Sequence, residues 1–280
     1  MSIEEWIERL ENLPPAPRVL PKLLKLLNHI DTSAQEIVDL IQLDASLTAK
    51  LIGISNSAYY GAGGTISGLD EAVNRLGFQE IYRTVNLICA KSFVGQSVAV
   101  YEIDSEERWL SSVTTAIVME TICSKIRMGD PATGYTIGLL HDIGKIAINQ
   151  LFAEEYAEVL SKVEDDHMSL SDAEQEAFGF DHAEVGAVLL RKWDFPEEIS
   201  LPIEFQFDPV GCKSQKEYAS MLHLSRWVCA SIAGAPGKHG WAFDLKEEML
   251  DILKLSVEDI YPLMLDVKDK VNEKEDLVAL

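Results

Sequence analysis

Apolar residues recur at helical spacing along most of the chain, whereas the strict alternation of a half-buried strand is scarce. The segment after the capping box Ser33-x-x-Glu36 is a clear case, because its apolar residues follow a helical period up to Ile41. One more helix is predicted over the apolar stretch that contains His141 and Asp142. Comparable patterns predict helices over residues 69–76, 79–93, 106–126, 182–193 and 217–232, and charged amphipathic helices from 245 to 280. The fold class that follows is all-α.

Polar residues with capping chemistry precede several of these segments. Asp181-x-x-Glu184 is a second capping box, and it places His182 in the first turn of a helix. A helix start is predicted wherever such a side chain can accept a hydrogen bond from backbone N–H groups of the first turn. The predicted start caps are Ser33, Asp44, Ser67, Ser171 and Asp181.

The helices divide into two predicted lobes. Residues 95–105 are weakly patterned and are expected to connect an N-terminal helical lobe, residues 1–95, to a second lobe, residues 106–280, which includes a C-terminal helical extension. With 280 residues, of which 47% are hydrophobic, the chain can bury a sizeable core.

The formal net charge is −22, and most of it lies in the second lobe. Residues 1–100 carry 11 acidic and 8 basic side chains, whereas residues 101–280 carry 35 and 16. Because nucleic-acid affinity rests largely on lysine and arginine contacts to phosphates, we do not expect nucleic acid to be a direct ligand. The acidic helix surfaces between 154 and 176 and beyond 244 are expected to be solvated.

The sequence predicts a cytoplasmic protein with no membrane segment. Its longest apolar runs fall far short of the roughly 20 residues that cross a bilayer, and the acidic first residues do not resemble a signal peptide. The four cysteines, at positions 89, 123, 212 and 229, form no Cys-x-x-Cys pair, so reduced thiols are expected rather than disulfides or a zinc site. The oligomeric state cannot be predicted.

His141 and Asp142 are adjacent polar residues within an apolar stretch. A carboxylate and an imidazole are costly in such surroundings unless they are paired, hydrogen-bonded or bound to a metal ion. A hydrogen-bonded core histidine is the commoner outcome, so the pair alone is weak evidence for a metal site.

Several motifs that follow one another along the chain strengthen the case that His141 and Asp142 belong to a functional site. Residues 138–145, Gly-Leu-Leu-His-Asp-Ile-Gly-Lys, resemble the signature of the HD superfamily of metal-dependent phosphohydrolases, and residues 179–187 resemble the histidine-bearing helix start that follows it. Residues 13–17, 56–61 (Asn-Ser-Ala-Tyr-Tyr-Gly) and 72–77 resemble motifs of the HDOD family, the HD-related output domains of bacterial signalling. The resemblance covers about residues 13–209.

The resemblance implies a degenerate HD pocket. His141, Asp142, Lys145 and His182 match HD positions, but Ser111 stands where an upstream histidine ligand would lie. Gln206-Phe207 stands where a histidine pair is common, and Arg226 appears in place of the last aspartate. If any metal is bound, its ligands would be His141, Asp142 and His182, and so few donors make a two-metal centre improbable. A guanidinium at 226 would also repel a cation.

We therefore expect a non-catalytic signal-transduction module, without a cofactor, that acts through contacts with regulatory proteins. In this hypothesis Arg226, or failing that Lys145, pairs with Asp142 in place of the metal. The alternative is a phosphohydrolase with one divalent metal ion, acting on a nucleotide, cyclic dinucleotide or phosphate ester. Asn56, Ser57 and Tyr60 are candidate ligand or partner contacts, although Asn56 and Ser57 could equally hydrogen-bond the turn that ends their helix. A cleft between the lobes that binds a small molecule without turnover is a third possibility.

Overall fold

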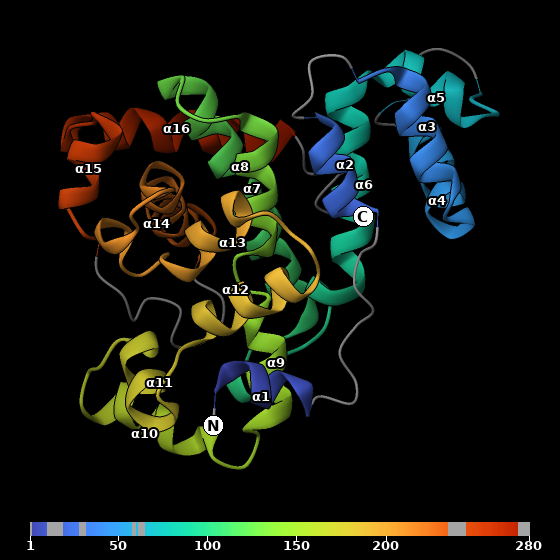
Figure 1. Cartoon of the computed structure of the whole chain (residues 1–280). Coiled ribbons are helices and arrows are strands. Elements are labelled where there is room, and N and C mark those ends of the chain that lie inside the picture. The colour runs from blue at the N-terminus through green and yellow to red at the C-terminus, as the bar shows by residue number, and fades with distance from the viewer. Residues whose placement is uncertain are drawn as a thin grey trace.

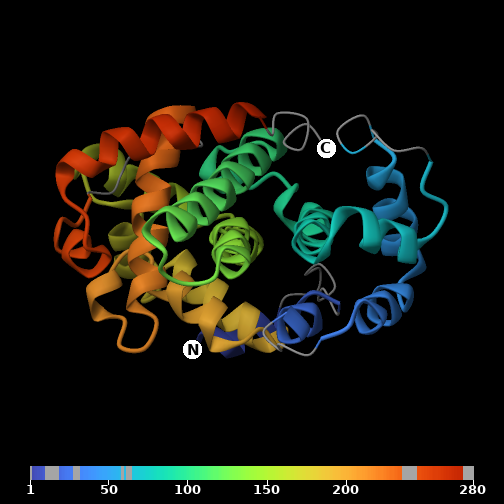
Figure 2. The ribbon, with the colours of Figure 1, turned by 90° about the horizontal axis from the view of Figure 1, so that it is seen from above.

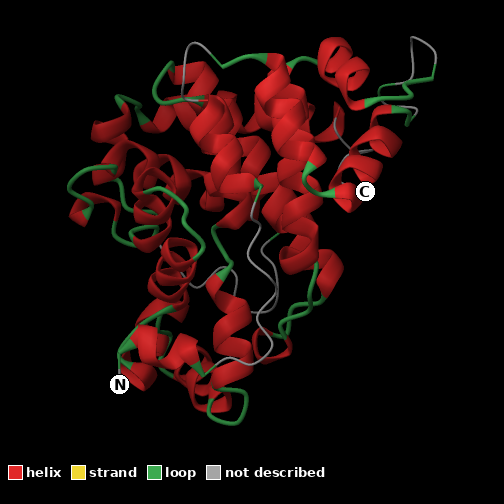
Figure 3. Cartoon of the chain, turned by 45° about the vertical axis from the view of Figure 1, so that its right-hand side comes forward, coloured by secondary structure: helices red, strands yellow, loops and turns green. Residues whose placement is uncertain are grey.

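The computed structural model describes residues 2–9, 19–27, 32–57, 60, 65–234 and 245–273. These residues form helices and no strand, which confirms the all-α class (Figure 3). Two short 3₁₀ helices, Ala99–Tyr101 and Pro209–Gly211, lie between α-helices. The α-helices are α1 (Ile3–Glu8), α2 (Leu20–Leu27), α3 (Ala34–Gln42), α4 (Ala45–Ser55), α5 (Leu69–Leu76), α6 (Phe78–Val94), α7 (Ser105–Ile126), α8 (Pro131–Leu140), α9 (Gly144–Leu151), α10 (Tyr156–Asp165), α11 (Leu170–Phe178), α12 (His182–Lys192), α13 (Glu197–Glu204), α14 (Lys216–Ala233), α15 (Glu248–Leu253) and α16 (Val257–Glu273).

Two helical lobes are visible, with α2 to α6 on one side and α7 to α16 on the other (Figures 1 and 2). The helix α1 departs from the predicted division at residue 95. It lies against the second lobe, where the Trp6 ring meets the Phe152 ring at a centroid distance of 5.0 Å and Ile7 is buried. The first helix of the chain therefore packs on the lobe that is formed by the later part of the sequence.

Close packing of α7 against α8 forms the centre of the second lobe. Glycines on α8 permit this approach, because a Cβ added at Gly138 would lie 2.7 Å from the Ala116 Cα, and one added at Gly134 would lie 2.6 Å from the Cys123 Sγ. The close contact at Gly138 is with backbone atoms, so a glycine is required there, whereas a side chain at position 134 would force the Cys123 thiol to move. The helix α14 packs across α7 and completes this core.

Local capping explains where several helices begin. The Ser33, Asp44 and Asp181 side chains accept hydrogen bonds from backbone N–H groups of their first turns, as predicted. Two predicted caps are wrong. Residue 68, a glycine, precedes α5 in place of Ser67, and Ser169 caps α11 in place of Ser171. In both cases the helix exists and the cap lies one or two residues away.

All four cysteines are free thiols, as expected from their spacing. Of the helices that the structure describes, none combines the length and the apolar character that a membrane span requires.

Candidate functional site

His141 and Asp142 lie in a turn between two helices, which corrects the prediction of one helix over this stretch. The helix α8 ends at Leu140 and α9 begins at Gly144. A Cβ added at Gly144 would lie 1.9 Å from the His182 carbonyl oxygen and 2.5 Å from the Gly186 nitrogen, so α9 begins in direct backbone contact with α12. This contact brings Asp142 next to His182, and it depends on a glycine at position 144.

Asp142 is the centre of a buried polar pocket. One carboxylate oxygen, Oδ2, accepts a hydrogen bond from the Lys145 ammonium at 2.7 Å. The other, Oδ1, lies 3.4 Å from His141 Nε2 and 3.7 Å from His182 Nε2. All four side chains are at most 5% exposed. The structure thus brings together four of the five residues that the sequence assigned to the pocket.

The charges of this pocket are balanced among its own side chains. Burial acts to raise the pKa of Asp142, but the neighbouring His141, Lys145, His182 and Arg226 hold it well below its usual value. Burial lowers the pKa of Lys145 and outweighs the opposing effect of Asp142. Burial also lowers the pKa of His141 to about 4, so its imidazole is neutral near pH 7. Its Nδ1–H donates to the Gly138 carbonyl oxygen at 2.7 Å.

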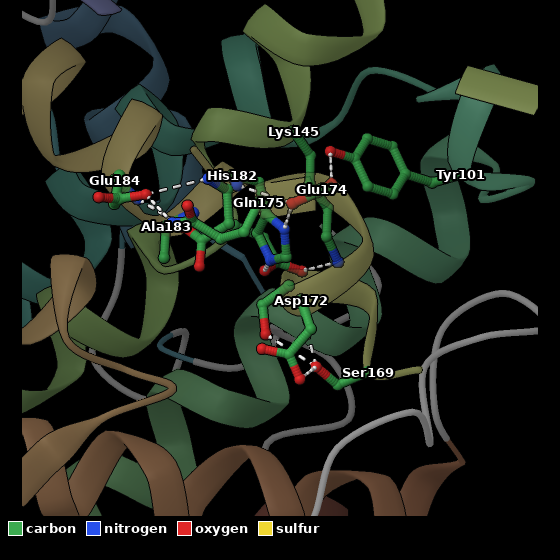
Figure 4. A network of polar contacts seen from close by, with 12 residues as sticks. Tyr101, Lys145, Ser169, Asp172, Glu174, Gln175, His182, Ala183 and Glu184 are labelled. Atoms are coloured by element: carbon green, nitrogen blue, oxygen red, sulfur yellow. Dashed lines mark hydrogen bonds and ion pairs between the residues drawn. The ribbon is translucent and has the colours of Figure 1, made fainter. Parts of the chain in front are cut away.

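Glu174 forms a second buried carboxylate centre, which Figure 4 shows with its partners Tyr101 and His182. One oxygen, Oε2, accepts from both the ring Nδ1 and the backbone N–H of His182, at 2.7 and 2.8 Å. The other, Oε1, accepts from the Tyr101 and Tyr156 hydroxyls at 2.7 and 2.6 Å. Burial acts to raise the pKa of Glu174, but His182 and these hydrogen bonds hold it below its usual value. Glu174 is 0% exposed, so the prediction that the acidic surface between 154 and 176 is solvated is wrong at this residue.

Two long polar side chains fix the backbone of the turn. The Arg108 guanidinium on α7 donates to the Asp142 carbonyl oxygen at 3.2 Å, and the Gln206 amide donates to the His141 carbonyl oxygen at 3.1 Å. Burial lowers the pKa of Arg108 to about 10. Both residues are far from the turn in sequence, and the motifs gave no indication of these roles.

Arg226 adds positive charge near Asp142, beside the Lys145 ion pair that the sequence hypothesis gave as its second choice. Its guanidinium lies over the Phe207 ring at 4.4 Å from the centroid, while Lys145 makes the ion pair. Its charge nevertheless helps to lower the pKa of Asp142. Arg226 therefore contributes to charge compensation, with its planar group packed on an aromatic face.

The donor set does not fit a divalent metal ion. Lys145, Arg108 and Arg226 already bring positive charge to Asp142, and Lys145 occupies one of its carboxylate oxygens. The described residues contain no group of three or more His, Cys, Asp or Glu side chains with the arrangement of a metal site. Position 111 supplies a serine on α7, and Gln206 uses its amide for the backbone of His141.

A second cavity, of about 320 Å³, adjoins the Asp142 pocket. The two share Phe207, whose ring also meets the His182 ring edge-on at 5.2 Å. The charged groups that line this cavity are mainly acidic: Asp172, Asp181 and Asp208 against Lys246. The Lys246 ammonium lies 3.3 Å from Asp208 Oδ1. The cavity therefore has three carboxylates and only one ammonium, which already pairs with one of them.

The three candidate contacts in the first lobe have different environments. The Asn56 amide donates to the Ile66 carbonyl oxygen at 2.8 Å and accepts from the Ile66 N–H at 2.7 Å, so it fixes the segment that follows α4. The Tyr60 hydroxyl donates to Glu80 on α6. Ser57 instead lines a cavity between α4, α6 and α7. Residues 58, 59 and 61 of the same motif lie outside the described residues.

A family model and a curated relative both match most of this chain. The HDOD domain model matches residues 13–209, which confirms the resemblance seen in the motifs. An uncharacterized protein of Treponema pallidum (strain Nichols) is 27% identical over 209 residues, which are 71% of this chain but only 38% of that protein.

Solved structures share the fold at low sequence identity. A candidate signal transduction protein from Marinobacter aquaeolei VT8 has a TM-score of 0.78 and 21% identity, and the match covers 99% of this chain and 64% of that one. An HDOD domain protein of unknown function from Geobacter sulfurreducens has a TM-score of 0.71, 22% identity and coverage of 99% and 94%. A candidate phosphohydrolase from Shewanella amazonensis SB2B has a TM-score of 0.71, 24% identity and coverage of 97% and 94%. The chain thus spans less than two thirds of the length of the Treponema and Marinobacter proteins.

Proposed function

The chain belongs to the HDOD domain family, which is related to the HD phosphohydrolases, and from this premise we propose that it is a non-catalytic signalling module of bacteria. In this proposal the HD pocket is structural and holds no cofactor, and the protein transmits a signal by binding regulatory proteins. The observation that carries the proposal is the ion pair between Lys145 and Asp142, at 2.7 Å within a fully buried site. An internal ammonium supplies there the positive charge that a metal ion would otherwise supply.

The charge at the neighbouring cavity supports the same proposal. Three aspartates and one lysine line the space beside the pocket, so a phosphate-bearing substrate would meet mostly negative charge on its approach. Phosphoryl chemistry depends on cationic groups that neutralise the reacting phosphate. This surface offers few of them.

One observation favours a second function, that of a metal-dependent phosphohydrolase. His141 Nε2 and His182 Nε2 both lie near Asp142 Oδ1, and neither that oxygen nor His182 Nε2 has a hydrogen-bond partner among the described residues. Three donors and one water would meet the minimum of a single catalytic zinc site. The cationic neighbours described above weigh against this function.

Metal analysis joined to an activity screen tests the proposal. Protein purified without chelator is expected to contain no stoichiometric metal and to hydrolyse neither phosphodiesters nor phosphomonoesters when manganese is supplied. His141→Ala and Lys213→Met, an exposed lysine outside the pocket, serve as the matched pair. Stoichiometric metal, with activity that His141→Ala abolishes and Lys213→Met leaves intact, would establish the phosphohydrolase instead.

The regulatory partner is proposed to be a protein. The surface of the second lobe is acidic, so a partner with a basic face would be complementary to it. We also propose a cytoplasmic location, since the four free thiols suit a reducing compartment.

A further inference from the structure

A cavity of about 560 Å³ lies between α4, α6 and the start of α7, and none of its lining residues belongs to the Asp142 pocket. Its walls are apolar and come from both lobes: Ile54 on α4, Leu87 and Ile88 on α6, and Trp109 on α7. Sites for small molecules have volumes of roughly 300–1,000 Å³ and mostly apolar walls with a few polar groups. The cavity meets both conditions.

Two lysines supply the charge at the cavity, and its lining contains no carboxylate. Lys50 on α4 and Lys91 on α6 are both exposed, and neither forms an ion pair with a carboxylate of the described residues. The Lys91 ammonium lies 5.4 Å from the centroid of the Trp109 ring, so positive charge sits directly beside the apolar wall. In a chain of net charge −22, this is a localised positive site.

Ser57 adds a neutral polar group to the same cavity. Its hydroxyl can donate one hydrogen bond and accept others, which suits an acidic head group that is also contacted by an ammonium. Trp109 is only 7% exposed, so it forms part of the wall and cannot present a whole ring face for a nucleobase to stack on.

We propose that this cavity binds a small amphipathic anion, with an acyl-like apolar body against Ile54, Leu87 and Ile88 and one carboxylate or phosphate group near Lys50 and Lys91. A neutral lipid would gain nothing from the lysines, and inorganic phosphate would gain nothing from the apolar walls. A ligand with both parts uses every feature of the cavity. This proposal is independent of whether the Asp142 pocket is catalytic.

Binding of four probes, each with an apolar tail of nine or ten carbons, to the full chain tests the chemistry of the ligand. Decanoate, decanol and decyltrimethylammonium carry an anionic, a neutral and a cationic head group, and decyl phosphate separates a phosphate from a carboxylate preference. Calorimetric titration is expected to give saturable binding of decanoate or decyl phosphate, each at least about tenfold tighter than decanol, since two nearby ammonium groups favour the anion. Decyltrimethylammonium is expected not to bind.

Two pairs of variants locate the binding site. Lys50→Met/Lys91→Met is expected to weaken decanoate binding about 25-fold, at roughly fivefold per ammonium. Lys213→Met/Lys216→Met makes the same change of net charge away from the cavity and is expected to have no effect. Gly53 lines the cavity, and a Cβ added there meets nothing within 4 Å. Gly53→Phe should therefore fill the cavity without disturbing the fold and abolish binding, whereas Gly53→Ala should retain most of it.

The outcomes that would overturn the proposal are distinct. Saturable binding of neither anion, equal binding of decanol, or equal weakening by the two double-lysine variants would each contradict it. Retained binding in Gly53→Phe, with an unchanged melting temperature, would place the site elsewhere. The melting temperature of each variant without ligand separates loss of binding from loss of folding.

Discussion

The Asp142 pocket and the cavity beside Trp109 differ in how their lysines and glycines are surrounded. Lys145 is 4% exposed and bound to a carboxylate, whereas Lys91 is exposed beside an indole ring. Gly144 touches the backbone of another helix, whereas Gly53 faces open space. Charge that is compensated within the protein stabilises the fold, and uncompensated charge beside an open apolar wall is available to a ligand.

The strongest test of this difference removes the buried carboxylate. Asp142→Ala leaves the Lys145 ammonium buried without its partner, and we expect the free energy of unfolding to fall by about 3–5 kcal/mol in urea denaturation. A double variant, Asp142→Leu/Lys145→Met, removes both charges and should recover a large part of that loss. An Asp142→Ala protein as stable as the parent would show that the ion pair has no structural role.

Gly144 and Gly53 differ in the room that each leaves for a side chain. Gly144→Ala forces a Cβ against the His182 carbonyl oxygen, and we expect a loss of about 3 kcal/mol, at the upper end of overpacking effects. Gly53→Ala, in the interior of α4, should instead stabilise the protein by up to about 1 kcal/mol, because alanine has the higher helix propensity. Thermal unfolding of both variants measures the contrast, and losses of similar size would contradict it.

The neighbouring residues Asn56 and Ser57 are expected to have different roles, because Asn56 bonds to the backbone of Ile66 and Ser57 lines the cavity. Asn56→Ala removes the amide that bonds to both backbone groups of Ile66, and we expect a loss of about 1–2 kcal/mol in urea denaturation. Ser57→Ala should change stability by less than about 0.5 kcal/mol and should weaken decanoate binding. Equal effects of the two substitutions on stability would remove this distinction.

The smallest expected effect concerns Lys91, one of the two lysines of the cavity. Lys91→Met should change the free energy of unfolding by no more than about 0.5 kcal/mol, because an exposed ammonium without a carboxylate partner contributes little to stability. Lys145→Met, measured under the same conditions, should cost several times as much. Similar losses in the two variants would show that the cavity lysine is also structural.

Local signals in the sequence predict the helices well. Each of the helices α3, α5, α6, α7, α12 and α14 begins and ends within a residue or two of its predicted bounds. Asp181-x-x-Glu184 succeeds because every partner of a capping box lies within one turn. Ser67 and Ser171 fail as caps by one or two residues for different reasons: Ser169 caps α11 with its own hydroxyl, whereas α5 begins after Gly68 without a side-chain cap.

The pocket could be predicted only in part, since its supports come from distant segments. The break after Leu140 depends on the contact between Gly144 and α12, and apolar periodicity carries no information about that contact. Tyr101 reaches Glu174 across 73 positions, and Arg108 reaches Asp142 across 34. One signal was available, because Glu174 shares a helix face with the apolar residues Leu170 and Ala173.

The Tyr101 and Tyr156 hydroxyls both donate to one oxygen of Glu174, and both phenol groups are buried. Phenolic protons held in this way are shielded from bulk water, and they exchange with it only when the surrounding helices open. In proton nuclear magnetic resonance spectra they should therefore give two slowly exchanging downfield signals. Those signals would show whether the second lobe is folded around Glu174. They could be observed without a substrate or a partner protein.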